Sequence, residues 1–214
     1  MSIKHCGHHH NEEWRKLVRR ILIGLATLVV ILAIVILLVW AILHPSKPRF
    51  VLQDVTVYNF TASAGPPYAL TAVIQATISS RNPNDRVGVY YHQLDVFPSY
   101  RGQQITAALL LPASYQGYND VTVWSPMLLG NDVPISPYLQ QLLSQDLNVG
   151  SMLVDIKIVG RVKWKVGSWV SGKYHFDVNC PAYLQLGGST GIIPVGPAMK
   201  LQLLLRCHVE TALG

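Results

Sequence analysis

The segment from Ile21 to Leu43 constrains the fold of this chain more than any other feature, because its 23 residues carry no charge. As an α-helix it would be about 34 Å long, enough to cross a hydrocarbon core of about 30 Å. A cleaved signal peptide is the alternative, but its apolar region spans about 7 to 15 residues and ends at a small-x-small site. Here the apolar run ends in VWAILHPSKP, so we predict an uncleaved transmembrane helix.

Basic residues are distributed unevenly about this span. The first fifteen residues after it hold only Lys47 and Arg49. Five basic residues precede it: Lys4, Arg15, Lys16, Arg19 and Arg20. Since the flank richer in Lys and Arg stays in the cytosol, we expect a cytosolic tail at 1–20 and the transmembrane helix at 21–43. A proline-containing stalk at 44–49 would lead to an exported domain at 50–214, which is large enough to bury its own core.

Export would permit two covalent features. Cys180 and Cys207 each lie in an alternating apolar pattern that turns the cysteine inward, and an oxidising compartment allows a disulfide between them. Two buried free thiols are the alternative, because the sequence does not show whether the two Cα atoms come within bridging distance. The only N-x-S/T sequon in the sequence begins at Asn59, where we predict a glycan.

The exported region consists of short alternating segments separated by turn residues. Between 70 and 80, Leu70, Ile74 and Ile78 face one way while Thr71 and Gln75 face the other, as in a half-buried antiparallel strand. The predicted strands cover 50–60, 70–80, 87–97, 101–110, 119–128, 151–166, 172–185 and 198–209, and only 135–147 predicts a helix. This pattern favours a mainly β fold, an antiparallel β-sandwich of immunoglobulin or fibronectin-III type with one short helix, over βαβ units.

The segment SSRNPNDRVGVYYHQ, residues 79–93, carries enough polar side chains to resemble an active site. Pro83 fixes φ at a turn position and asparagine side chains bond to nearby backbone, so the segment predicts a bend between strands. Strict alternation after the bend would divide the next residues between two faces, with Tyr90, His92 and Leu94 opposite Tyr91, Gln93 and Asp95. Since these side chains would not converge, we interpret the segment as a turn.

Motifs over nearly the whole chain occur in a specific order. They are LHPSKPRF at 43–50, RNPN and GVYY within 81–91, YQG at 115–117, VWSP at 123–126, GNDVPI at 130–135, WKVG at 164–167, and the late pair Cys180 and Cys207. In these features the chain resembles the plant NDR/HIN-like (NHL) membrane proteins, whose exported part is a late-embryogenesis-abundant group-two (LEA_2) domain. The resemblance implies a seven-stranded sandwich with a short helix, at the plasma membrane or plasmodesmata, in pathogen defence, the hypersensitive response and stress. It implies no catalytic residues.

Recognised metal-binding motifs are absent from the sequence, which contains no H-E-x-x-H, C-x-x-C or P-loop. GGSTG at 187–191 spells G-x-S-x-G, but no predicted helix follows it, as the strand-to-helix turn of that motif requires, and it lacks the lysine of a phosphate loop. The tail stretch KHCGHHH offers soft ligands, but a short polar tail lacks the folded frame of a structural metal site. We therefore expect no catalytic residue, no cofactor and no metal. A hydrolase with a site assembled across strands ranks last among the functions considered.

The segment KIVGRVKWKVG gives the one signal for a functional surface. If it forms a strand, Val162 and Trp164 face the core. The opposite face then carries a basic stripe made of Lys157, Arg161, Lys163 and Lys165. A purely solubilising or aggregation-blocking face is the alternative. A functional stripe would hold an anionic partner electrostatically, either acidic wall polysaccharide or phospholipid headgroups.

These observations predict a non-catalytic surface protein anchored in the bilayer through residues 21–43. Its exported sandwich would act as an interaction module of plant defence and stress, binding a protein or a cell-wall polymer. A structural tether or protective module that binds wall polymer or lipid headgroups is the second hypothesis. Nucleic acid is not expected as a partner outside the cell, and the sequence assigns no oligomeric state.

Overall fold

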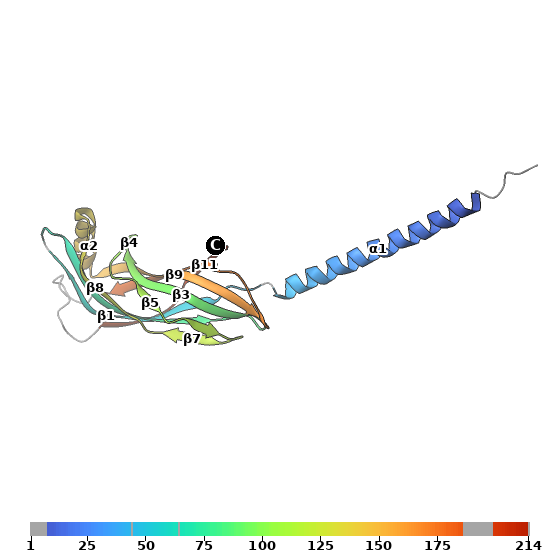
Figure 1. The fold of residues 1–214 in the computed structure, drawn as a ribbon. Coiled ribbons are helices and arrows are strands. Elements are labelled where there is room, and N and C mark those ends of the chain that lie inside the picture. The colour runs from blue at the N-terminus through green and yellow to red at the C-terminus, as the bar shows by residue number, and fades with distance from the viewer. Residues whose placement is uncertain (1–7, 44, 64, 186–198, 214) are drawn as a thin grey trace, which may run out of the picture. The chain divides into compact units, whose positions relative to one another are not determined.

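The computed structural model describes residues 8–43, 45–63, 65–185 and 199–213. Its contacts divide the chain into two compact units, Met1–His44 and Pro45–Gly214. The first unit contains helix α1 (His8–Leu43), in which Trp14–Leu37 is long and apolar enough to cross a membrane (Figure 1). α1 begins well before Ile21, so part of the tail at 1–20, for which no structure was predicted, is helical.

The second unit is built from two antiparallel sheets. In the first sheet β1 (Arg49–Ala62) lies between β12 (Met199–Arg206) and β2 (Ala69–Arg81). The other edge of β2 pairs with two shorter strands, β7 (Val121–Trp124) and β8 (Met127–Pro134). Alternate residues of β2 are buried, which is the pattern that its sequence predicts.

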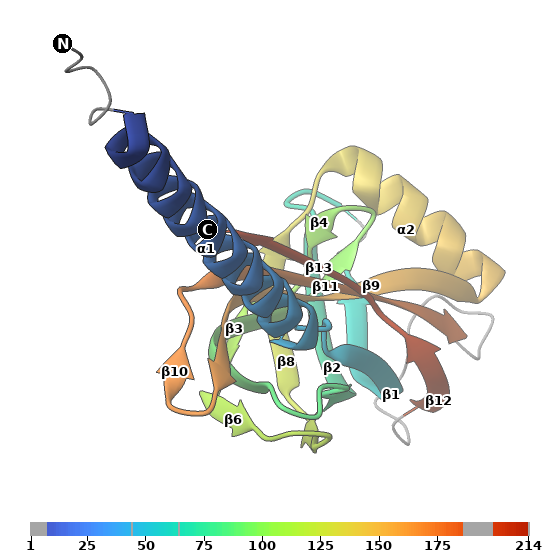
Figure 2. The ribbon, with the colours of Figure 1, turned by 90° about the vertical axis from the view of Figure 1, so that its right-hand side faces the viewer.

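The second sheet follows the order β13 (His208–Leu213), β11 (Tyr174–Gln185), β9 (Ser151–Val166), β3 (Gly88–Tyr100) and β4 (Gln103–Gln104). Two short strands, β5 (Leu109–Leu111) and β6 (Ser114–Gln116), also pair with β3. A further short strand, β10 (Trp169–Val170), pairs with β9. The two sheets form the layers seen in Figures 1 and 2, so the predicted mainly β, antiparallel fold is confirmed.

Apolar and aromatic side chains from both sheets share one core. Phe50 of β1 stacks on Trp124 of β7, with ring centroids 6.2 Å apart, and its ring also lies 5.4 Å from that of Phe176 on β11. Tyr91 of β3 meets Trp124 edge to face at 5.4 Å. These rings join the two layers near the strand ends where the chain enters the domain, and offset or edge-to-face pairs are the favoured aromatic geometries.

The helix α2 (Pro137–Val149) packs against β9, close to the predicted 135–147. The Ser136 hydroxyl caps it by accepting from the Leu139 amide. Asp146 receives two contacts from the end of β3: the Tyr100 hydroxyl donates to it at 2.6 Å and Arg101 forms an ion pair at 3.1 Å. Burial, with the hydrogen bond to Asp146, raises the pKa of Tyr100 to about 12.

Three predicted strands are wrong in extent. The predicted strand 198–209 is divided at Cys207 between β12 and β13, which belong to different sheets. Residues 101–110 do not form one strand, because the chain turns at Arg101 and Gly102 and pairs again only in the short β4 and β5. Residues 119–128 are divided between β7 and β8 by Ser125 and Pro126. Pro126 has no amide hydrogen to give to a sheet, although its carbonyl oxygen accepts from the Ala76 amide at 3.2 Å.

The polar segment after β2 is a bend, as predicted, and its asparagines are buried. The Asn82 side chain is 0% exposed and donates to the carbonyl oxygens of Val87 and Gly117, at 2.7 Å each. The Asn84 amide nitrogen donates to Asn82 Oδ1 at 2.8 Å and to the Ser46 carbonyl at 2.7 Å, while the Ser46 amide donates back to Asn84 Oδ1 at 2.8 Å. These bonds fix the entering chain to the bend.

A second buried polar cluster lies beside the bend. The Tyr91 hydroxyl bonds to Ser80 Oγ and to Gln116 Oε1, at 2.8 Å each, and Gln116 Nε2 donates to the Ser80 carbonyl at 2.7 Å. Burial raises the pKa of Tyr91. The polar side chains of RNPN and YQG therefore satisfy buried backbone and side-chain groups, which is a structural role.

The predicted alternation after the bend is wrong because β3 contains a bulge. The register between β3 and β9 shifts between Tyr91 and Gln93, so Tyr91 and Leu94 are both buried at 2% exposure. Tyr90, His92, Gln93 and Asp95 thus share the outer face, instead of being divided between two faces. A Cβ at Gly160 of β9 would collide with the Gln93 carbonyl, so glycine permits the close approach of the two backbones at the bulge.

Candidate functional site

The basic stripe lies on the outer face of the second sheet, as the sequence of β9 predicts. Val162 and Trp164 are buried, at 0% and 5% exposure. The intervening cationic side chains point away from the core: Arg161 is exposed, and Lys157, Lys163 and Lys165 are half-buried. Alternation along one regular strand thus produces a line of cations over an apolar inner face.

The surroundings of Lys157 differ from those of the other three cations. Asp155 lies on one side of Lys157 along this strand face. On the other side Val159, which stands between Lys157 and Arg161, pairs with Asp95 of β3 and with Asp177 of β11, so these two aspartates are diagonal neighbours of both cations. Arg161 instead pairs with Gln93 and His175, Lys163 with Tyr90, and Lys165 with Gly88. In the part of the chain that the structure describes, none of Arg161, Lys163 and Lys165 forms an ion pair. The positive charge of Lys163 and Lys165, toward the bend and the chain entry, is therefore uncompensated among the described residues.

Two tyrosines stand beside these cations on neighbouring strands. Tyr90 of β3 pairs with Tyr115 of β6, and their ring centroids are 4.5 Å apart with planes tilted by 40°. The Lys165 ammonium lies 5.7 Å from the centroid of Tyr90 and 5.2 Å from that of Tyr115, and contacts the Tyr90 hydroxyl at 3.4 Å. Cation–π attraction on both rings holds this lysine and the tyrosine pair together.

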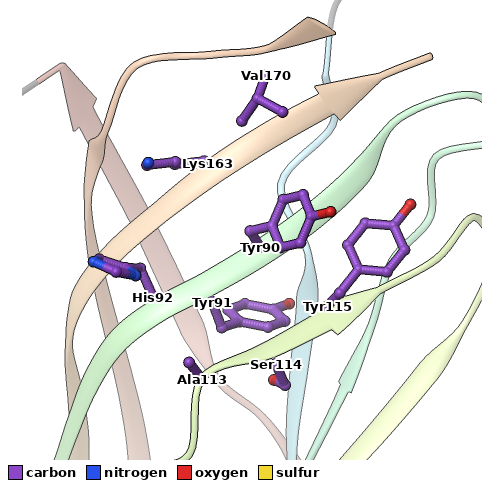
Figure 3. A pocket seen from close by; sticks show the side chains of 8 residues that line it. All are labelled: Tyr90, Tyr91, His92, Ala113, Ser114, Tyr115, Lys163 and Val170. Carbon is purple, nitrogen blue, oxygen red and sulfur yellow. The ribbon is translucent and has the colours of Figure 1, made fainter. Parts of the chain in front are cut away.

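A hollow of about 450 Å³ opens beside this tyrosine pair. Figure 3 shows Tyr90 and Tyr115 on one side of it, and Lys163 and His92 on the other. The remaining lining residues are Tyr91, Ala113, Ser114 and Val170. We call this the tyrosine hollow; its volume lies in the range of small-ligand pockets, about 300 to 1,000 Å³.

Gly88 makes room for the ring of Tyr115. A Cβ on Gly88 would collide with the hydroxyl and ring carbons of Tyr115, so glycine at the start of β3 leaves room for the ring in its present position. Sequence analysis did not select Tyr115 or Gly88 as site residues. The only signal for them was their place in GVYY and YQG, and the pairing of β3 with β6 is what brings them together.

A second hollow of about 400 Å³ lies on the other side of β9. It is lined by Arg161 together with Lys173, Tyr174 and His175 from the start of β11. Arg161 and Lys163 are two residues apart on one strand face, so about 6.6 Å of backbone separates the cations of the two hollows. We call this the arginine hollow. The two hollows together form a basic and aromatic region at one end of the outer face.

The predicted modification sites lie elsewhere in the domain. Cys180 of β11 and Cys207 form a disulfide in the structure, with Cα atoms 4.3 Å apart. Cys207 stands between β12 and β13, where the chain passes from the first sheet to the second, and its amide donates to the Phe50 carbonyl. Asn59 is half-buried in β1, next to a register shift between Val57 and Asn59.

Nothing in the described region forms a metal site. No group of three or more His, Cys, Asp or Glu side chains comes together among the residues that the structure describes. His5 and Cys6 of the tail lie outside those residues, as does the GGSTG stretch. The side chains that line the two hollows of the outer face are cationic, imidazole, phenol and small groups.

Comparison with known proteins identifies the class of this domain. Residues 77–180 match a family model described as late embryogenesis abundant protein, LEA_2. The chain is 47% identical over 209 residues to NDR1/HIN1-like protein 1 of Arabidopsis thaliana, covering 97% of this chain and 100% of the relative. It is 43% identical to NDR1/HIN1-like protein 12, covering 98% and 100%, and 34% identical to NDR1/HIN1-like protein 26, covering 87% of each, both from Arabidopsis thaliana.

The chain belongs to the NDR1/HIN1-like family of LEA_2 proteins, which confirms the resemblance seen in its motifs. Among solved structures, a protein from Archaeoglobus fulgidus matches with a TM-score of 0.32 and 12% identity, over 63% of this chain and 96% of that one. That similarity is too weak to bear on fold or function.

Proposed function

We propose that this protein is a non-catalytic surface protein of plant stress and defence, anchored in the plasma membrane by α1 and exporting its β-sandwich as an interaction module. The long apolar helix supports the anchor, and the family membership supports the stress and defence context. The five basic residues before the span support a cytosolic N-terminus and an exported domain at 45–214.

The observation that carries the interaction role is the uncompensated charge at one end of the outer face. Arg161, Lys163 and Lys165 lie in a line and have no ion pair in the described part of the chain. Lys163 lines the tyrosine hollow and Arg161 lines the arginine hollow, and both hollows have aromatic side chains in their walls. A merely solubilising stripe requires exposed lysines but no hollow beside them. Aromatic side chains and arginine beside a concavity are characteristic of binding surfaces.

Topology provides the first test. A protease added to intact cells should digest the domain at 45–214 and leave the tail and span protected. Digestion of the tail with protection of the domain would contradict the proposed orientation. Detergent-permeabilised cells, in which both sides become accessible, serve as the control.

Binding provides the second test. The triple variant Arg161→Gln, Lys163→Gln, Lys165→Gln should keep its fold, because these side chains lie outside the core, but should lose saturable binding to proteins or polymers of the plant cell surface. If the triple variant still bound, the interaction surface would lie on another part of the domain. Binding of polymer or lipid without any protein partner would support the second candidate function, a structural tether, which the same uncompensated charge favours.

A further inference from the structure

We propose that the tyrosine hollow binds one sugar unit of an acidic oligosaccharide whose sugars carry carboxylates, and that the arginine hollow binds a neighbouring unit of the same polymer. This inference rests on the proposed export of the domain, and it goes further by naming the ligand class and the residues that hold it. The arrangement combines an aromatic wall with cations at the rim, and each part matches one feature of a uronic-acid sugar.

The aromatic wall fits the ring of a sugar. Tyr90 and Tyr115 are tilted by 40° and held by Lys165, so they offer rigid apolar surface with hydroxyl groups at its margin. Phenol rings pack against the C–H faces of a sugar while their hydroxyls bond to its polar edge. Gly88 and Lys165 are positioning residues in this account, because they place the rings before a ligand arrives.

The rim cations fit a carboxylate. Lys163 lines the hollow opposite the two rings, next to His92 (Figure 3), and carries no ion pair in the described region. The lysine ammonium is a compact charge on a flexible stem. It can therefore reach a carboxylate on the sugar ring from several directions, whereas the planar guanidinium of arginine requires the carboxylate to lie in its plane. The Arg161 guanidinium in the arginine hollow can bind the next carboxylate by two parallel hydrogen bonds.

The location favours a polymer over a lipid surface. Anionic phospholipids are concentrated in the cytoplasmic leaflet, and the proposed orientation places the domain on the opposite side. The cations also lie in concave hollows on one sheet face, whereas a flat bilayer would contact a protruding surface. A soluble or wall-bound acidic polymer satisfies both the charge and the concavity.

A direct binding experiment tests this assignment. The full-length chain is placed in nanodiscs of zwitterionic phosphatidylcholine and titrated with a fluorescent oligomer of galacturonic acid. The same oligomer with its carboxylates methyl-esterified is the neutral control ligand. We expect saturable binding of the acidic oligomer that weakens with added salt, since the screening length is about 8 Å at 0.15 M, and no comparable binding of the ester.

Variants at matched positions locate the site. Tyr115→Leu should weaken binding about tenfold, the effect of one lost aromatic contact, and Lys163→Gln should weaken it severalfold. Arg161→Gln should affect oligomers but not a single galacturonic acid. Lys157→Gln and Tyr183→Leu should bind like the parent, because Lys157 is on the same strand face but surrounded by aspartates, and Tyr183 is an exposed tyrosine on the same sheet. Unchanged melting temperatures exclude unfolding as the cause.

Several results would overturn the assignment. Equal binding of the ester would exclude carboxylate recognition. Equal weakening by Lys157→Gln and Lys163→Gln would show diffuse attraction instead of a site. Equally tight binding to phosphatidylserine vesicles, with the same response to Tyr115→Leu, would make the ligand a general anion. Failure of the oligomer to bind, while the chain still captures a saturable protein partner, would refute this inference and leave the proposed function intact; the protease test decides the export on which both depend.

Discussion

Replacing Asn82 by aspartate should strongly destabilise the domain, because the two side chains have the same shape but different hydrogen-bonding groups. The Asn82 amide donates to the carbonyls of Val87 and Gly117, at 2.7 Å each, and Asn82 itself is 0% exposed. A carboxylate has no donor, so both carbonyls would lose their partner and face a buried negative charge. Each orphaned buried group costs about 1 to 3 kcal/mol, so the free energy of unfolding should fall by about 3 to 5 kcal/mol at neutral pH.

The loss of unfolding free energy in Asn82→Asp should depend on pH. Burial, together with the two carbonyl oxygens that would face the oxygen in place of Nδ2, raises the pKa of the introduced carboxyl group above its value in the unfolded chain, against the two hydrogen bonds that Oδ1 still accepts from Asn84. The folded variant therefore keeps a proton that the unfolded chain releases, so stability is highest below the unfolded pKa and is lost as pH rises through the folded pKa. Urea unfolding of the fragment 45–214, followed by tryptophan fluorescence between about pH 4 and pH 7, measures the size and the pH dependence.

Asp85→Asn is the matched control within the same bend. Asp85 is exposed and accepts one hydrogen bond from Asn119 Nδ2 at 2.7 Å, which an amide oxygen can still accept. The free energy of unfolding of the Asp85→Asn variant should differ from that of the parent by less than about 0.5 kcal/mol. The reasoning would be refuted if Asn82→Asp lost less than about 1 kcal/mol at neutral pH, because the bend would then tolerate a carboxylate oxygen that faces two carbonyl oxygens.

Three further predictions concern other parts of the domain. The double variant Cys180→Ser, Cys207→Ser should lose about 3 to 4 kcal/mol of stability in urea, because the bridge spans 27 residues of sequence separation; two free thiols found by mass spectrometry in the native protein would contradict the bridge. Asn59 should carry a glycan in the plant host, seen as a mobility shift on glycosidase treatment that Asn59→Gln abolishes; no shift would mean that the half-buried sequon is not used. Above pH 10, stability should fall toward pH 12, because folded Tyr100, with its pKa raised from 10.0 to about 12, keeps a proton that unfolded tyrosine releases. Tyr100→Phe should reduce that slope by one proton in urea titrations, and an unchanged slope would show that Tyr100 titrates normally.

Regular elements were predictable from sequence because their periodicity is local. The uncharged run at 21–43 lies within α1, and the alternation of β2 and β9 correctly assigns the buried and outer faces of both strands. Because successive side chains of a strand point to opposite faces, the sequence of β9 also predicted that Trp164 faces the core and that the basic stripe faces outward. These features depend on neighbours in sequence and need no knowledge of the partner strand.

The tyrosine hollow could not be predicted in this way, because it depends on pairing between distant segments. One extra residue at His92 reverses the alternation of β3, and the space for that bulge is provided by Gly160 on β9. Tyr115 reaches Tyr90 only because β6 pairs with β3, and its ring needs the absent side chain of Gly88. A single sequence contains no direct signal for either contact.

The way in which the chain enters the domain has a mechanical consequence. The entering segment is fixed to Asn84 through Ser46 and continues into β1, which is hydrogen-bonded on one side to β12 and on the other to β2. Because ladder bonds run perpendicular to the strands, a pull on Pro45 along β1 would load the bonds of both ladders in shear, many at once, instead of opening them one after another. A domain that held a wall polymer while its N-terminus was fixed in a membrane would therefore carry tension through a strand that is hydrogen-bonded along both edges.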